Sequence, residues 1–182
     1  TGASTQDLSG LATGTYTITI TDANNCTSTS SASVTQPVAA LNASASVSNT
    51  VSCFGGADGQ ISLTVNGGTS PYSYVWSNGA NTQNISGLTS GTYTVTITDG
   101  NGCTDNASAT VTQPAAALSG STTITGNISC FSGNNGSIDL TVAGGTGPFS
   151  YSWSNGATSQ DLSGLAAGTY NVTITDARGC TA

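Results

Sequence analysis

Residues 91–103 read Gly-Thr-Tyr-Thr-Val-Thr-Ile-Thr-Asp-Gly-Asn-Gly-Cys, which is the pattern of a β-strand that ends in a tight turn. The large apolar side chains of Tyr93, Val95 and Ile97 alternate with threonines, so one face of the strand is apolar and the other polar. The Asp-Gly-Asn-Gly segment that follows has strong turn-forming residues. We therefore predict a half-buried strand over residues 93–98, followed by a turn that carries Cys103.

The same pattern occurs three times in the 182 residues. Gly-Thr-Tyr stands at residues 14–16, 91–93 and 168–170, so that each copy lies 77 residues after the previous one. The offset holds without insertion or deletion for other markers as well: Cys26, Cys103 and Cys180; Cys53 and Cys130; Trp76 and Trp153; and the Gln-Pro pairs at 36–37 and 113–114. Self-similarity at a fixed period predicts a tandem array of small domains.

The Gln-Pro pairs give natural boundaries, because proline does not continue a central strand. Residues 38–114 then form one complete repeat. Residues 1–37 correspond to the C-terminal half of a preceding repeat, and residues 115–182 to a following repeat that lacks its last strand. We expect the chain to be part of a longer array.

The complete repeat predicts about seven short strands, separated by Gly-, Asn- and Asp-rich turns. Leu41–Val47, Ile61–Val65 and Tyr72–Trp76 alternate as residues 93–98 do, and weaker strand material lies around Thr82–Ile85 and Leu88. A tryptophan on the third strand and the spacing Leu-x-x-Gly-x-Tyr before the sixth are typical of immunoglobulin-like sandwiches with a tyrosine corner. The predicted fold is all-β, with tandem immunoglobulin-like (PKD-like) β-sandwich repeats of 77 residues. In it Trp76, Trp153, Tyr16, Tyr93 and Tyr170 have core or structural roles.

The composition excludes several classes of function. The chain has eight Asp, one Arg, and no Lys, Glu or His, for a net charge of −7. Without His there is no imidazole base or imidazole metal ligand, and one cation cannot neutralise a nucleic-acid backbone. No apolar run approaches the roughly 20 residues needed to cross a bilayer. We therefore expect no enzyme activity, cofactor, metal site, nucleic-acid partner or membrane span in this segment.

Several motifs together resemble the SprB repeat. They are Ser52-Cys53-Phe54-Gly55-Gly56, Trp76-Ser77-Asn78-Gly79, and Gly91-Thr92-Tyr93 followed by Gly102-Cys103, and the likeness covers essentially the whole chain. SprB repeats are found in very long cell-surface adhesins of gliding bacteria and are similar to PKD-like β-sandwiches. The resemblance implies export by a type IX route and display outside the cell, at the bacterial surface, as a filament.

Two cysteines per repeat in a small Gly-rich β-domain indicate disulfides and an oxidising compartment. The simplest pairing lies within a repeat, Cys53–Cys103 and Cys130–Cys180, and leaves Cys26 without a partner. If strands alternate in direction, however, the turn holding Cys53 lies where the chain leaves the repeat, and the turn holding Cys103 lies where it comes in. A seven-residue strand is about 23 Å long, whereas bridged Cα atoms are about 4.4–6.8 Å apart. Strand order therefore favours an inter-repeat Cys53–Cys180 bond; both pairings stay open at this point.

The function that fits these features best is a structural one: a stalk segment that spaces and transmits force in a secreted surface adhesin or extracellular filament. Its partners would be neighbouring repeats of the same chain, with lateral self-association as a further possibility. The alternative is a repeated carbohydrate-binding module, in which aromatic side chains stack on surface glycans and many weak sites act together. The alternation around Trp76 and Trp153 places both rings on the inward face, which favours the structural role.

Overall fold

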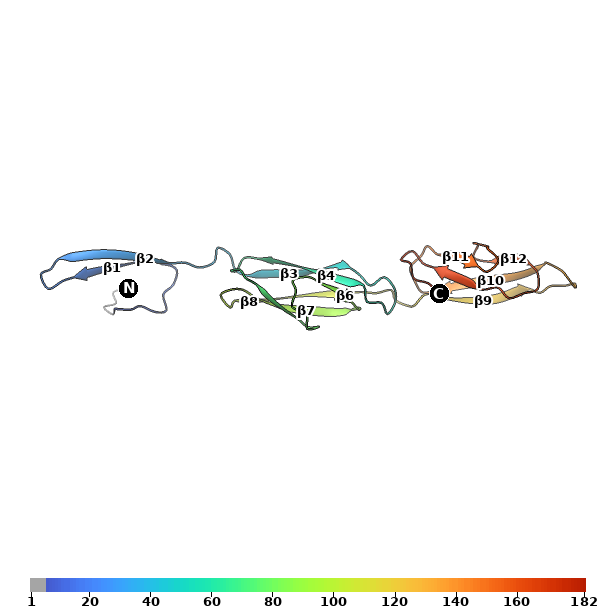
Figure 1. The fold of residues 1–182 in the computed structure, drawn as a ribbon, viewed down its shortest axis with the longest axis horizontal. Helices are drawn as coiled ribbons and strands as arrows, with labels where there is room; N and C mark the ends of the chain where they lie inside the picture. Colours follow the sequence, from blue (N-terminus) through green and yellow to red (C-terminus); the bar gives the residue numbers. More distant parts are fainter. Residues whose placement is uncertain (1–5) are drawn as a thin grey trace.

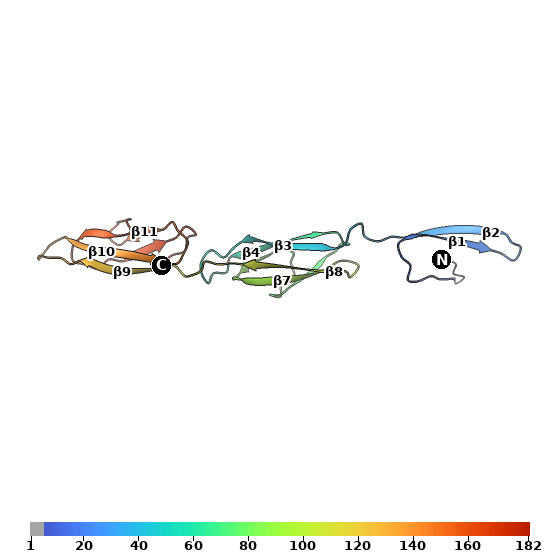
Figure 2. The ribbon, with the colours of Figure 1, turned by 180° about the vertical axis from the view of Figure 1, so that it is seen from behind.

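The computed structural model describes residues 6–182, which form three parts in a row along one long axis (Figures 1 and 2). We call them the N-terminal hairpin, the central unit and the third unit. No helix occurs among the residues that the structure describes, so none there could cross a membrane. Residues 1–5, which the first expected repeat includes, lie outside the described residues. The chain is all-β, as predicted.

The strands recur with the 77-residue period of the sequence, because equivalent segments carry the same alternation and turn residues. The hairpin consists of β1 (Gly14–Thr21) and β2 (Thr27–Val34). The central unit consists of β3 (Asn42–Asn49), β4 (Gly59–Asn66), β5 (Ser73–Trp76), β6 (Ile85–Leu88), β7 (Gly91–Thr98) and β8 (Thr104–Val111). The third unit consists of β9 (Ser119–Gly126), β10 (Gly136–Ala143), β11 (Ser150–Trp153), β12 (Leu162–Leu165) and β13 (Val172–Thr175).

The central unit is a sandwich of two three-stranded sheets, in the orders β3-β4-β6 and β5-β7-β8. All pairings within the sheets are antiparallel, so β3 and β6 run in one direction and β4 in the other. In the second sheet, β5 and β8 both run opposite to β7. Ala43 bonds to Asp105 near the starts of β3 and β8, and Val51 bonds to Thr112 just past their ends, so these two strands run in the same direction. The turn after β3 and the turn after β7 therefore lie at opposite ends of the unit. We call the end where the chain comes in proximal and the end where it leaves distal.

The seventh strand that the sequence led us to expect is absent. Residues 77–84 return from the end of β5 to the start of β6 without joining a sheet. Two of their side chains instead bond to the edge of β4: Gln83 Nε2 donates to Leu63 O at 2.8 Å, and Leu63 N donates to Asn84 Oδ1 at 2.9 Å. Gln160 and Asp161 make the same two bonds to Leu140 in the third unit. Side-chain groups thus replace the ladder that a further strand would have formed.

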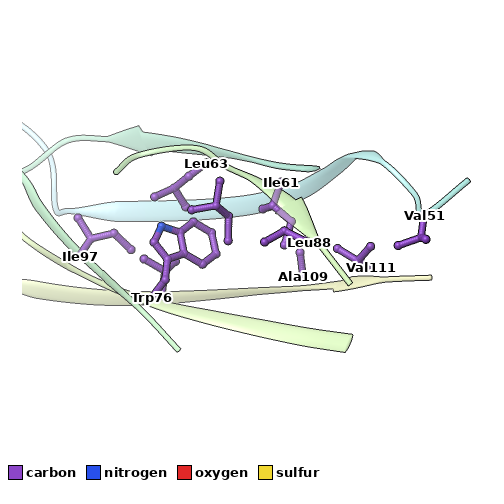
Figure 3. Close-up of a cluster of buried hydrophobic side chains, with 10 residues drawn as sticks. Val51, Ile61, Leu63, Trp76, Leu88, Ile97, Ala109 and Val111 are labelled. Carbon is purple, nitrogen blue, oxygen red and sulfur yellow. The ribbon is translucent and has the colours of Figure 1, made fainter. Parts of the chain in front are cut away.

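The core of the central unit lies between its two sheets (Figure 3). Trp76 is only 2% exposed, and its indole Nε1 donates to Thr82 O at 2.8 Å, so the buried ring keeps its hydrogen bond. At the distal end Val111 of β8 packs so close to Gly59 that a Cβ on this glycine would lie 2.6 Å from Val111 Cγ1. The other buried hydrophobic residues are Val51, Ile61, Leu63, Ile85, Leu88, Val95, Ile97 and Ala109.

The third unit has the same core with fewer members. Leu140, Trp153, Leu162, Leu165 and Ile174 are buried, but β13 is paired only by β11, apart from one bridge between Thr175 and Thr181. In the third unit, a cavity of about 250 Å³ lies at the position that β8 covers in the central unit. Ile128, Gly136 and Tyr170 are among the residues that line it. Within residues 6–37 no second sheet covers Ile18 and Ile20, which are 49% and 59% exposed.

A tyrosine corner is present in all three parts. The hydroxyls of Tyr16, Tyr93 and Tyr170 donate to the carbonyl oxygens of residues four positions earlier, at 2.8, 3.1 and 3.0 Å. These bonds tie the segment before each strand to the strand itself, as in immunoglobulin-like domains. The predicted immunoglobulin-like sandwich is therefore confirmed.

Candidate functional site

The features that set this chain apart from a set of separate domains lie where the central and third units meet. We call this region, around the linker 112–118, the second junction, and the equivalent region around residues 35–41 the first junction. Each junction receives a turn of the unit that follows it, and each turn contains an aspartate and a cysteine.

In each turn, the aspartate side chain fixes the backbone that carries the cysteine. In the third unit, Asp176 Oδ1 accepts from the N–H groups of Arg178 and Cys180, both at 2.9 Å, and Oδ2 accepts from Thr146 N at 2.9 Å. Asp99 makes the same three bonds in the central unit, to Asn101, Cys103 and Thr69. Both carboxylates are only 5% exposed. A carboxylate with three backbone donors fixes the turn, which agrees with the turn-forming role that the sequence favours.

Hydrogen bonding outweighs burial in setting the charge of these carboxyls. Burial raises the pKa of Asp99, but the backbone N–H groups of Thr69, Cys103 and Asn101 hold this pKa below its usual value. Burial also raises the pKa of Asp176. The N–H groups of Cys180, Thr146 and Arg178, together with the Arg178 charge, outweigh burial and hold this pKa below its usual value. Both carboxyl groups are therefore ionised at neutral pH.

A disulfide joins Cys53, in the loop after β3, to Cys180, in the Asp176 turn of the third unit. The two Cα atoms are 5.7 Å apart, although 127 residues separate them along the chain. This is the inter-repeat pairing that strand direction favours. The within-repeat pairs Cys53–Cys103 and Cys130–Cys180 are not formed, because Cys103 and Cys53 lie at the proximal and distal ends of the central unit respectively.

Non-covalent contacts surround this disulfide. In the linker, Gln113 Oε1 accepts from Gly55 N at 2.9 Å, and Thr112 O accepts from Val51 N at 2.9 Å. From the third unit, Arg178 Nη1 donates to Thr50 Oγ1 and to Val51 O, both at 3.2 Å. A cavity of only about 120 Å³ remains between the units, lined by Cys53, Phe54, Pro114, Ala116, Ala117, Leu118, Gly145, Asp176, Cys180 and Thr181.

The first junction has an equivalent cavity, which is larger and is not crossed by a disulfide. A cavity of about 400 Å³ is lined there by Pro37, Leu41, Gly68, Asp99 and Cys103, each 77 residues before a residue that lines the second junction. Cys103 is exposed and free, whereas its equivalent Cys180 is bonded. Cys26 and Cys130 are likewise exposed and free. In the described chain, then, one pair of the five cysteines is joined.

The remaining predicted residues lie in the interior or beside it. Trp76 and Trp153 are 2% and 3% exposed, so neither offers a ring face to a sugar. Within residues 6–182, no group of three or more Cys and Asp side chains is close enough together to hold a metal ion.

Sequence reasoning missed two contributors to the second junction, Gln113 and Arg178. Gln113 was noted only as part of the boundary marker Gln-Pro, and the guanidinium of Arg178 reaches a loop that is 127 residues away. Arg178 did carry a signal, since it is the sole cation of the chain and stands where the other repeats have Asn24 and Asn101.

Comparison with known proteins gives similar solved structures and a family match. The crystal structure of a tetra-tandem repeat in the extending region of a large adhesion protein is similar, with 19% identity and a TM-score of 0.28. The similarity covers 96% of this chain and 56% of that one. No curated protein matches.

A family model for the SprB repeat matches twice, over residues 45–81 and 122–158. Each match starts within the first strand of a sandwich and ends just after its tryptophan, and the two starts are one 77-residue period apart. Two segments of the chain, one in the central unit and one in the third unit, are thus similar to the SprB repeat.

Proposed function

We propose that this chain is a stalk segment of a long bacterial surface adhesin, in which folded repeats provide reach and transmit force. The repeat boundaries would follow the Gln-Pro pairs, so that 38–114 is one mechanical unit. The observation that carries the proposal is the Cys53–Cys180 disulfide, which joins two repeats rather than closing one.

Two covalent connections restrict motion at the second junction. The linker 112–118 joins the units at one point, and the disulfide joins them at another. Two bodies that are joined at two points can turn only about the line between those points. The contacts of Arg178 with Thr50 and Val51 cross between the units and oppose that remaining motion, while the Gln113 bond to Gly55 holds the start of the linker against the central unit. An array with such junctions would behave as a rod.

The fold of the central unit also suits a load along its axis. Its strands run along the long axis of the molecule (Figure 1). The chain comes in through β3 and leaves through β8, and these two strands run in the same direction and pack against each other. Ala43 N of β3 donates to Asp105 Oδ2 of β8 at 2.7 Å. Pulling on both ends loads these contacts in shear, so that they would resist together rather than break one after another.

The cell surface is the location that fits this role. Structural disulfides persist outside the cytosol, and SprB repeats together with a disulfide support an extracellular position. We propose a structural rather than a catalytic role. An antibody raised against this segment should label intact cells of the producing bacterium, and loss of labelling after brief surface proteolysis would support display. Labelling only after the cells are broken would contradict it.

The rod is tested by small-angle X-ray scattering of the chain with Cys26, Cys103 and Cys130 changed to serine. The matched control has Cys53→Ser and Cys180→Ser in the same background. We expect a long, narrowly distributed maximum dimension for the disulfide-bonded chain and a shorter, broader one for the control. Equal distributions would show that the disulfide does not stiffen the array.

The carbohydrate-binding alternative has less support, because the two tryptophans that could stack on sugar rings are buried. A glycan array probed with the same disulfide-bonded chain should remain empty. Reproducible binding to one glycan class would favour the alternative.

A further inference from the structure

We propose that Thr50, Val51 and Asp58 form a guanidinium-binding site on the distal end of the central unit, and that this site selects the repeat that docks after it by its arginine, Arg178. We call these three residues the distal site. Recognition between neighbouring repeats is a property separate from the stalk role and does not depend on it.

The guanidinium of Arg178 reaches two acceptors on the distal end of the central unit. Arg178 Nη1 donates to Thr50 Oγ1 and to Val51 O, both at 3.2 Å. Asp58 holds the loop that presents these acceptors, because its Oδ1 accepts from Ser52 N at 2.9 Å and its carbonyl accepts from Asn49 Nδ2 at 2.9 Å. Two hydrogen bonds from Ser52 lower the pKa of Asp58 most, and the Arg178 charge contributes to the same lowering. The loop that accepts these two bonds from the sole cation of the chain therefore also carries the carboxylate of Asp58, which is bonded to Ser52, the residue next to Val51.

The other repeats differ from this pair at both positions. Asn101 and Asn24 stand where the third unit has Arg178, and Asn135 stands where the central unit has Asp58. The distal end of the third unit, with Asn127 and Asn135 in place of Thr50 and Asp58, thus lacks the carboxylate. We infer that it receives a repeat with an uncharged residue at the position of Arg178, as the central unit has.

Selection matters because the cysteines themselves do not discriminate. Every distal cysteine of the array is equivalent to Cys53 and every proximal one to Cys180, so oxidation alone could join any such pair. A contact that forms before oxidation decides which thiols meet. A complementary charge across the contact favours the matching repeat, and an arginine facing a distal end without a carboxylate does not gain this attraction.

The bond itself forms by thiol–disulfide exchange with a small-molecule disulfide such as oxidised glutathione. The thiolate of one cysteine attacks the glutathione disulfide and releases one glutathione thiolate. The thiolate of the second cysteine then attacks the mixed disulfide and releases the other. The two protein thiols lose two protons and two electrons, and glutathione disulfide accepts the electrons and becomes two thiols.

The test measures the equilibrium between the Cys53–Cys180 bond and glutathione, by mass spectrometry of the chain in which the other three cysteines are serine. The variants are Arg178→Asn, Asp58→Asn and both together. Asp58→Asn should keep the loop intact, since Asn135 Oδ1 already accepts from Ser129 N at 3.2 Å in the third unit. It removes the charge and little else.

We expect Arg178→Asn to lower this equilibrium constant about two- to fivefold and Asp58→Asn to lower it by a similar factor, as measured for partly exposed charge pairs. The equilibrium constant of the double variant should be close to that of Arg178→Asn alone, because losing the Asp58 carboxylate has no further effect once the arginine is gone. The matched control, Asn101→Arg, adds a cation to the equivalent turn of the central unit and should leave the constant unchanged.

Two results would overturn the proposal. One is a constant unaffected by Arg178→Asn, which would show that the disulfide forms without the contact. The other is the full Asp58→Asn effect in the chain that already carries Arg178→Asn, which would show that Asp58 acts on the loop and not on Arg178. Circular dichroism of each variant distinguishes both results from a failure to fold. None of these outcomes bears on whether the array is displayed as an adhesin stalk.

Discussion

At the scale of single residues, the aspartates of the cysteine turns connect the fold to the junction. Asp176 holds the turn from which both Cys180 and Arg178 reach the preceding unit, and Asp99 holds the equivalent turn around Cys103. An aspartate that was predicted to form a turn thus also positions the residues of the junction.

The charge of these aspartates predicts the response to acid. Because their pKa values are lower in the folded chain than the usual value of about 4, their stabilising contribution is complete above pH 4 and is lost as the pH falls through the folded pKa. We expect a melting temperature that is constant from pH 7 to about 5 and decreases below 4.

Asp176→Asn should lower the melting temperature at pH 7 and make it less sensitive to acid, because the amide nitrogen would face the Thr146 N–H donor. Asp139→Asn, which removes one charge from the middle of β10, is the matched control. An unchanged acid profile in Asp176→Asn would contradict this role.

The sequence predicts most residues of the interior and fewer of those at the junction. Tyr93 and Trp76 follow from period-two alternation and from known spacings, which depend only on neighbours in sequence. The role of Arg178 depends on which loop of another repeat lies opposite its side chain, and local patterns hold no information on that.

At the scale of elements, the segment 77–84 shows where local pattern and structure part. Weak strand material was expected to start near Thr82, but the strand β6 starts only at Ile85, and the amide groups of Gln83 and Asn84 bond to the edge of β4 in its place. Alternation predicts which side chains face inward. It does not tell whether main-chain or side-chain groups form the hydrogen bonds to the edge of the neighbouring strand.

Removing this substitute should destabilise the unit. Asn84→Ala leaves the N–H of buried Leu63 without its acceptor, and we expect a loss of about 1–3 kcal/mol in the free energy of unfolding. Urea denaturation followed by tryptophan fluorescence measures it. Asn81→Ala, an exposed change in the same segment, should cost much less. Equal losses for the two variants would show that the bond to β4 is not important.

At the scale of the whole molecule, stability should vary along the axis. The N-terminal hairpin has two strands and no covering sheet, and a two-stranded hairpin alone is marginal in water. The central unit has a full two-sheet core. We expect hydrogen exchange to be fast throughout β1 and β2 and slow in β4 and β7, as measured by mass spectrometry of peptic fragments. Equal protection of β1 and β7 would show that the hairpin is stabilised by more than its own pairing.

Alternating strand direction placed Cys53 and Cys103 at opposite ends of a repeat when seven strands were expected. The placement holds with six strands because residues 77–84 run back from the end of β5 to the start of β6, so that these two strands point the same way. The short Gln-Pro linker also implied that the facing ends of two units lie close together, but the sequence did not show how residues 112–118 turn. Gly145 shows this dependence: at a φ of +64°, it leaves room beside Asp176 for Leu118 of the linker.

The bridge between Cys53 and Cys180 also changes what a single cut can do. A protease that cleaves one peptide bond anywhere between these residues, across 127 positions of the chain, opens a ring but frees no fragment. The two pieces remain fastened through sulfur, and two separate cuts are needed to release anything. If further repeats are joined in the same way, the disulfide-closed rings overlap along the chain, and cleavage of one peptide bond does not divide the array.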